Sequence, residues 1–339
     1  MNQTAAPHSP TSAGPRRSRL EKVLANGGIV LALLVIAIVC TALAEPRFMN
    51  RLNLINLGRN FSFLLIPALA QALVMTAGGF DLSVGVVMAL GSVVTAVVMG
   101  AVAASMPGMD WLAILAALGA VIGVGLAVGL TNAVLVARFA LSPFMVTLAV
   151  MSSLTGIALY YTQGIPIYGV LDSFIAGVGR GQIAGLPVIL VIALALLAVC
   201  VVVQRYTLLG RHIYAVGSDE RAARLSGVRT QRVLIVTYAL AGVLAAFTGF
   251  LMAARIGSGQ ATIGGTLALE TIAAAVIGGV SLRGGVGRVE LVALAALFLA
   301  VIANAMNLLQ LDSKYQTLVL GVVLILALGM ERLLLRGKE

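Results

Sequence analysis

Charged side chains are scarce in this sequence, since Asp, Glu, Lys and Arg make up only 10% of its 339 residues while 60% are hydrophobic. A soluble domain of this size needs a far more highly charged surface. Most of the surface must therefore face lipid. The sequence also contains 38 glycines, which suit helices that pack backbone to backbone in a membrane.

Residues that carry covalent or metal chemistry are few. The two cysteines, Cys40 and Cys200, lie in apolar runs and are predicted to be small buried side chains rather than a disulfide or a metal site. The two histidines, His8 and His212, lie in polar segments without zinc-binding or catalytic spacing. The patterns G-x-x-x-x-G-K-[ST], H-E-x-x-H and G-x-S-x-G are absent. We therefore expect neither an enzyme nor a cofactor, metal or ATP site in this chain.

The net charge of +10 has two interpretations. Basic proteins often bind nucleic acid, but no run of Lys and Arg here alternates with aromatic residues as a nucleic-acid groove requires. Membrane proteins accumulate positive residues in their cytoplasmic loops, because such residues resist translocation. We expect this second cause, and no nucleic-acid partner.

Long apolar runs predict an all-α integral membrane protein with about ten transmembrane helices, because a segment in lipid must satisfy its own backbone hydrogen bonds. The predicted spans are 27–44, 61–77, 82–104, 111–136, 143–161, 187–204, 233–254, 267–281, 289–309 and 315–335. A tail (1–26) precedes the transmembrane domain (27–335), and a short tail (336–339) follows it. The first span is expected to be retained, although its small-residue end (42–44) would also suit cleavage of a signal peptide.

Positive residues divide unequally between the two sets of loops. If the N-terminus is cytoplasmic, the inner segments carry 16 of them: Arg16, Arg17, Arg19, Lys22, Arg138, Arg205, Arg211, Arg221, Arg224, Arg229, Arg232, Arg283, Arg288, Arg332, Arg336 and Lys338. The outer segments carry 6: Arg47, Arg51, Arg59, Arg180, Arg255 and Lys314. This asymmetry predicts that both termini are cytoplasmic. The outer loop 162–186 is rich in glycine and is predicted to be irregular or re-entrant.

Two glycine-rich segments, 78–85 and 278–285, match at an offset of 200 residues. They indicate a two-fold internal repeat, parallel or inverted, although coincidence is a serious alternative in a chain this rich in glycine. In the first segment, Gly78 and Gly79 are predicted to end the second span. Asp81 or Ser83 is then predicted to cap the third.

Ionisable residues near the predicted spans are candidates for a transport pathway, although each also has a structural explanation. Asp81 and Glu270 are the acidic candidates, and Arg255 lies at a span boundary. The combined set of turn or pathway candidates is Gly78, Gly79, Asp81, Ser83, Glu270, Gly278 and Gly279.

The polar inner loop 205–232 contains a short predicted helix over 218–227. Ser218 is a suitable N-cap, Asp219 and Glu220 occupy the first turn, and Arg224 lies near the end, as the helix dipole favours. Ala222, Ala223 and Leu225 leave a smooth patch, and so short a helix requires a surface to dock against. The segment is either an ordinary basic connector or a docking helix whose residues are Ser218, Asp219, Glu220, Arg221, Ala222, Ala223, Arg224, Leu225 and Gly227.

Close helix packing is predicted within 119–129. Gly119 and Gly123, and likewise Gly125 and Gly129, place small residues on one face of an apolar helix. Packing inside one subunit is the expected use, and a dimer interface is the alternative.

Three stretches, 78–85, 215–228 and 272–285, resemble the permease subunits of ABC-type monosaccharide importers, the ribose, xylose and arabinose branch. The chain departs from the family pattern at Phe80, where Ile is commoner, and at Ser218-Asp219, where the family tends to have Gly-Asn. The resemblance extends from near Phe48 to Leu335, and it does not identify the sugar.

The resemblance implies a role as the membrane-spanning subunit of an ATP-driven importer in the bacterial inner membrane. Two permease copies, identical or different, would form the path for a monosaccharide or related polyol among the membrane lipids. A separate ABC ATPase subunit would bind ATP and dock on 218–228, and an extracytoplasmic binding protein would deliver the sugar. A stand-alone secondary transporter or channel is the alternative, and a membrane enzyme is a weaker one.

The unequal distribution of positive charge predicts the side of the membrane on which each loop lies. A cysteine placed at Ser226 should react with impermeant reagents only from the cytoplasm, because it lies in the most basic inner loop. A cysteine placed at Ser173 should react only from outside. Labelling of both positions from the same side would contradict the ten-span arrangement.

Overall fold

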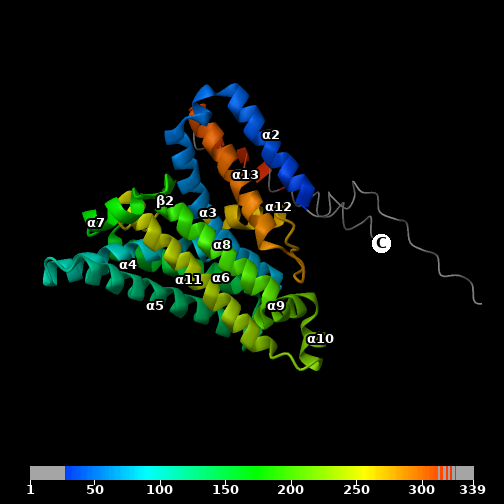
Figure 1. The fold of residues 1–339 in the computed structure, drawn as a ribbon. Coiled ribbons are helices and arrows are strands. Elements are labelled where there is room, and N and C mark those ends of the chain that lie inside the picture. Colours follow the sequence, from blue (N-terminus) through cyan, green and yellow to red (C-terminus); the bar gives the residue numbers. More distant parts are fainter. Residues whose placement is uncertain (1–26, 312–313, 316–317, 320, 323–324, 326–339) are drawn as a thin grey trace, which may run out of the picture.

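The structure is a computed structural model, and it describes residues 27–311, 314–315, 318–319, 321–322 and 325 (Figure 1). In chain order the elements are α2 (Ile29–Ala44), η2 (Pro46–Met49), α3 (Arg51–Thr76), α4 (Val84–Ser105), α5 (Asp110–Ala137), α6 (Pro143–Thr162), α7 (Asp172–Phe174), η3 (Ile175–Gly179), β1 (Gln182–Ile183), β2 (Leu186–Pro187), α8 (Val188–Tyr206), α9 (Leu208–Ser218), α10 (Glu220–Leu225), α11 (Thr230–Ile256), α12 (Leu267–Ile277) and α13 (Val289–Leu308).

Seven helices in the described part are long and apolar enough to cross a membrane: α3, α4, α5, α6, α8, α11 and α13. Two apolar helices, α2 with 16 residues and α12 with 11, are shorter. The all-α membrane class is thus confirmed, whereas the count of about ten spans is not. The predicted tails (1–26 and 336–339) and most of the predicted tenth span (315–335) lie outside the described residues.

Helix α3 is the centre of the bundle. In its most apolar stretch 89% of the residues are buried, against 17% for α6. It packs against α8, α11, α12 and α13 (Figure 1). The helix begins at Arg51, ten residues before the predicted second span, because the side chain of Asn50 accepts a hydrogen bond from the Leu52 amide at 3.0 Å and so caps it.

Helices α4, α5 and α11 form a second layer that glycines hold together. Gly125 and Gly129 of α5 lie directly against the backbone of α11, where a Cβ at Gly125 would stand 2.6 Å from the Gly242 carbonyl oxygen. The predicted packing inside one subunit is therefore confirmed for this pair. Gly119 and Gly123 have no atom within 4 Å of the place that a Cβ would take, so they lie open on the surface of α5.

The outer helices expose apolar side chains, as surfaces in contact with lipid do. Helix α2 packs on α13 and exposes Cys40, so the prediction that both cysteines are buried holds only for Cys200. Exposed aromatic residues lie near both ends of the long helices, in the pattern of the aromatic belts at membrane interfaces. They are Trp111, Tyr160, Tyr161 and Tyr168 toward one end and Phe139, Phe144 and Tyr206 toward the other.

The two ends of the bundle differ in structure. One end, called the α10 side below, carries α9, α10 and the end of α3. The opposite end, called the hairpin side, carries the predicted irregular loop, which folds into α7, η3 and an antiparallel hairpin of β1 and β2. Residues Ala184 and Gly185 make the hairpin turn, both at positive φ, as a tight two-residue turn requires. Gly179 of this loop lies directly against the backbone at the end of α11.

Packing of α5 on α11 predicts different effects of the same substitution at two neighbouring glycines. Gly125→Leu forces a side chain into the α11 backbone and should cost about 1–3 kcal/mol or more of stability. Gly123→Leu is the matched control and should leave the melting temperature of the detergent-purified chain unchanged, because its surroundings are open. Equal losses for both variants would contradict the packing described.

Candidate functional site

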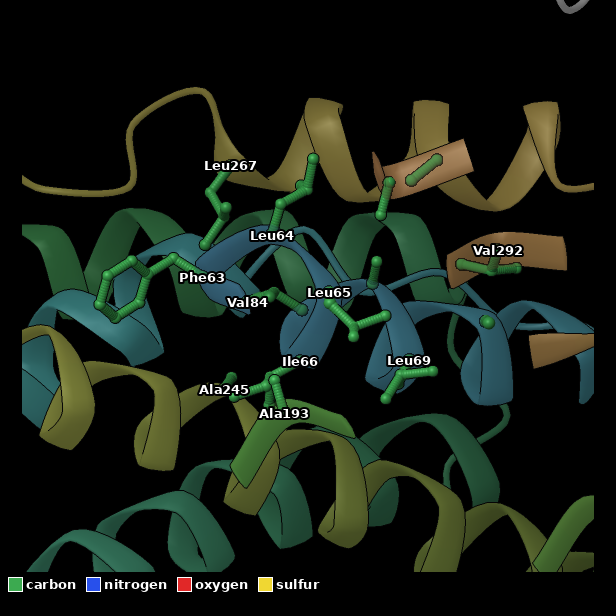
Figure 2. Close-up of a cluster of buried hydrophobic side chains, with 14 of the residues drawn as sticks. Phe63, Leu64, Leu65, Ile66, Leu69, Val84, Ala193, Ala245, Leu267 and Val292 are labelled. Carbon is green, nitrogen blue, oxygen red and sulfur yellow. The ribbon is translucent and has the colours of Figure 1, made fainter. Parts of the chain in front are cut away.

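Helix α4 begins inside the bundle rather than at its edge. Figure 2 draws Val84, its first residue, next to Leu64 and Leu65, which lie midway along α3, and all three belong to one buried cluster. The turn 77–83 therefore leads back inward from the end of α3. The hydroxyl of Tyr238, two turns inside α11, donates to the Phe80 carbonyl at 3.1 Å and fixes the turn at this depth.

Helix α12 begins at the same place and runs the other way. The segment before it passes along α4, with Gly259 against Ser92 and Gly264 against Gly85, and Leu267 follows directly (Figure 2). Eleven residues make a helix about 16 Å long, roughly half the thickness of a membrane's hydrocarbon core. The helix ends at Ile277, so the predicted span 267–281 is replaced by a half-helix.

The ends of α3 and α12 share one type of C-cap. In each, a glycine at positive φ follows the cap, and the next amide bonds back to the fifth preceding carbonyl: Gly79 to Val74, and Val280 to Ala275, both at 2.9 Å. The left-handed residues are Gly78 and Gly279, which are 201 residues apart. The predicted offset of 200 therefore pairs residues of different conformation, and the internal repeat is not confirmed.

A buried polar cluster holds the start of α4. One carboxylate oxygen of Asp81 accepts hydrogen bonds from the amide and the hydroxyl of Ser83, at 2.8 and 2.5 Å. The amide of Asn132 in turn donates to that hydroxyl at 3.0 Å. The side chains of Asp81 and Ser83 make no capping hydrogen bond to the first turn of α4, contrary to the predicted capping role. Asp81 instead holds Ser83, the residue directly before the first residue of the helix.

The segment that leads into α12 and the first turn of the helix carry exposed polar groups, together with the 50% exposed Leu269, at the middle of the bundle. Thr262, Gly265 and Thr266 are exposed and Glu270 partly so, with the Thr266 hydroxyl donating to the Glu270 carboxylate at 2.6 Å. Polar groups at this depth are expensive in lipid and normally face protein or water. Glu270 thus lies partly exposed at the surface, whereas Asp81 lies in the protein interior.

The predicted docking helix exists as α10, with a different cap. Ser218 ends α9, and Asp219 is the N-cap, since its side chain accepts from the Ala222 amide at 3.0 Å. The carboxylate of Glu220 accepts hydrogen bonds from the Arg224 guanidinium at 2.6 Å and from the Thr230 hydroxyl at 3.0 Å. Gly227 adopts the predicted left-handed conformation after the helix, with φ of 85°. These contacts tie α10 to the start of α11.

Two alanines and a leucine were expected to form one smooth patch on this helix, and the structure divides them. Ala223 is 5% exposed and packs inside the chain, whereas Leu225 is 90% exposed and Ala222 is exposed beside it. The accessible patch is therefore Ala222 and Leu225. The face of α10 that meets α9 and α11 buries Ala223 and leaves no room there for a partner.

A glycine junction, formed by Gly78, Gly217, Gly284 and Gly285, connects α9 to the end of α3 and to the loop before α13. Gly217 touches the carbonyl of Thr76, whose oxygen also accepts the Gly285 amide at 2.9 Å. Backbones meet here at distances that no Cβ would allow.

The tyrosine before this junction holds α9 in place. The hydroxyl of Tyr214 donates to the Gly287 carbonyl, and burial raises the pKa of Tyr214, which keeps this donor protonated. Sequence reasoning missed Gly217, Thr76 and Tyr214, because partners from distant segments define their role. In the sequence, the positions of the glycines were the only signal that indicated close backbone contact.

Long apolar helices around a half-helix, with a polar face at mid-depth and a supported helix projecting at one end, define a multi-pass membrane permease. The chain belongs to a permease family, since residues 53–328 match the model described as the permease component of branched-chain amino acid transport systems. Curated relatives place it among the sugar permeases of ABC transporters.

Three relatives illustrate the similarity. The ribose import permease protein RbsC of Escherichia coli K12 is 36% identical over 94% of this chain and 96% of its own length. RbsC of Bacillus subtilis 168 is 35% identical with the same coverage of both chains. The galactose/methyl galactoside import permease protein MglC of Salmonella typhimurium is 33% identical over 91% of this chain and 95% of its own. No solved structure matches the chain.

The contacts of Asp81 predict that its hydrogen bonds matter more than its charge. Asp81→Asn should keep normal melting and sugar uptake, because an amide oxygen can accept the same two bonds from Ser83. Asp81→Leu should lose about 1–3 kcal/mol, because it leaves a buried amide and hydroxyl without an acceptor. An Asp81→Asn variant that melts normally but does not transport would show that the charge itself is required.

Proposed function

We propose that two copies of this chain form the path of an ATP-driven importer for a monosaccharide or related polyol. A separate ABC ATPase subunit docks on α10 and hydrolyses the ATP, and an extracytoplasmic binding protein delivers the sugar to the hairpin side. The α10 side is cytoplasmic in this arrangement, in agreement with the distribution of 16 and 6 positive residues between the two sets of loops.

The exposure of Leu225 is the observation that carries this proposal. Leu225, 90% exposed, offers with the exposed Ala222 an apolar contact that a partner protein can cover. Helix α10 lies beyond the ends of the spans, among the arginines of the polar segment, where lipid tails do not reach. Its support by Asp219, Glu220 and Thr230 holds the leucine in a fixed position, as a docking surface needs.

The junction at Gly217 supports a mechanical role for this docking surface. A movement of α10 passes directly to α9, because Asp219 caps the one helix and follows the last residue of the other. From α9 it reaches the end of α3 through Thr76 and the loop before α13 through Gly285. The end of α3 leads through the turn 77–83 to the start of α4, and the loop before α13 follows the end of α12. Closure of an ATPase dimer would therefore be transmitted toward mid-depth through α3 and α4.

The polar face of α12 supports a path for an uncharged, hydroxyl-rich solute. Thr262, Thr266 and the partly exposed Glu270 offer hydrogen-bonding groups at a depth where lipid contact is unfavourable. A second copy of the chain facing this surface would close the path. The relatives are named for ribose, galactose or methyl galactoside, and arabinose, so a monosaccharide is the favoured class of substrate.

The docking role predicts that two substitutions on α10 have different effects. Leu225→Asp should abolish co-purification of the ATPase and ATP-driven uptake while leaving the melting temperature unchanged, because the side chain is 90% exposed. Ala223→Trp should lower the melting temperature, because that position is buried against α9 and α11. The measurements are pull-down of the ATPase, uptake, and thermal unfolding of the permease alone. Normal ATPase capture by Leu225→Asp would refute the docking role.

A further inference from the structure

Two arginines meet without a counter-charge on the hairpin side of the bundle. Arg59, in the third turn of α3, is only 9% exposed and donates to the Arg180 carbonyl at 3.0 Å. Arg255, in the last turn of α11, lies close enough to repel it. Both guanidinium groups reach the same atom, Oδ1 of Asn56, over long distances of 3.5 and 3.4 Å.

The charges of this arginine pair are not balanced within the described part of the chain. The ion pairs there are Glu45 with Arg47, Arg205 with Glu290, and Glu220 with Arg224, and none involves Arg59 or Arg255. In addition, Nε of Arg59 is buried without a hydrogen-bond partner. A buried cation is costly unless an anion accompanies it. The single neutral oxygen of Asn56 is a weak substitute for one.

The depth and the neighbours of the pair indicate what kind of anion fits. Helix α11 has 27 residues and is about 40 Å long, so its last turn lies at the level of the lipid headgroups. Two exposed apolar residues lie beside the charges: Leu52, one turn before Asn56, and Ile256, directly after Arg255. A phosphate with an apolar tail matches this combination, and arginine binds phosphate through several donors at once.

We propose that Arg59, Arg255 and Asn56 form a binding site for a phosphate group, which enters where the Asn56 amide oxygen now stands between the two guanidinium groups. A phospholipid headgroup and inorganic phosphate share this chemistry. The site belongs to the permease alone and is independent of the solute that it carries.

The full-length chain, purified in detergent, tests the proposal through its melting temperature. The two ligands are inorganic phosphate in buffers of matched ionic strength and a short-chain phosphatidylglycerol. At saturation the lipid, or both ligands, should raise the melting temperature of the unmodified chain by about 3 °C or more. A shift with the lipid alone identifies a headgroup site, and a shift with both shows that free phosphate suffices.

Asn56→Asp supplies the missing charge from within the chain. It should melt higher than the unmodified protein without any ligand and should no longer respond to phosphate. Asn60→Asp is the matched control, because it adds the same charge to an exposed asparagine one turn further along α3 that makes no hydrogen bond to either arginine. That variant should melt like the unmodified chain and keep its response to phosphate.

Removal of a cation completes the test. Arg255→Gln, at a partly exposed position, should fold and lose most of the response to phosphate, even if Arg59→Gln fails to fold. The proposal is overturned if neither ligand shifts the unmodified chain, or if Asn56→Asp and Arg255→Gln respond as it does. Weaker capture of the binding protein by Arg255→Gln, with no phosphate effect in any variant, would assign the arginines to a protein carboxylate instead.

Discussion

Every backbone amide and carbonyl buried in a membrane needs a hydrogen-bond partner, and the turn 77–83 meets this requirement inside the bundle. The C-cap at Gly78 satisfies the end of α3, Asp81 holds the amide of Ser83, and Tyr238 holds the carbonyl of Phe80. Because the turn is satisfied at this depth, α4 can begin beside the middle of α3. The half-helix α12 can then meet it there, which produces a polar face where a continuous span would present only apolar side chains.

The same turn connects the middle of the bundle to its surface. Gly217 of α9 lies against Thr76, the last residue of α3, and α10 follows α9 directly. Glycine is required at this contact because the backbones approach too closely for a Cβ. A short helix that is unstable alone thus gains a rigid base from α9 and α11, and its exposed leucine becomes a fixed feature of the surface. The proposed docking, transmission and solute path all depend on one set of backbone contacts.

Sequence reasoning predicted the long spans and the glycine stop after α3, because hydropathy and glycine caps are local signals. It failed for α12, since an apolar run does not reveal where its helix lies in depth. Ser218 and Asp219 are both good caps, and the choice between them depended on how far α9 extends. The buried face of α10, with Ala223 inward, follows from contacts with α11. The arginine pair joins residues 59 and 255, which no local pattern connects.

Reconstituted transport tests the central claim most directly. Proteoliposomes should contain the permease, its ATPase and its binding protein, with ATP on the α10 side and labelled monosaccharide on the hairpin side. Sugar should accumulate only when all three proteins and ATP are present, and vesicles with the permease alone should accumulate none under a proton or sodium gradient. Gradient-driven accumulation by the permease alone would contradict the account and identify a secondary transporter.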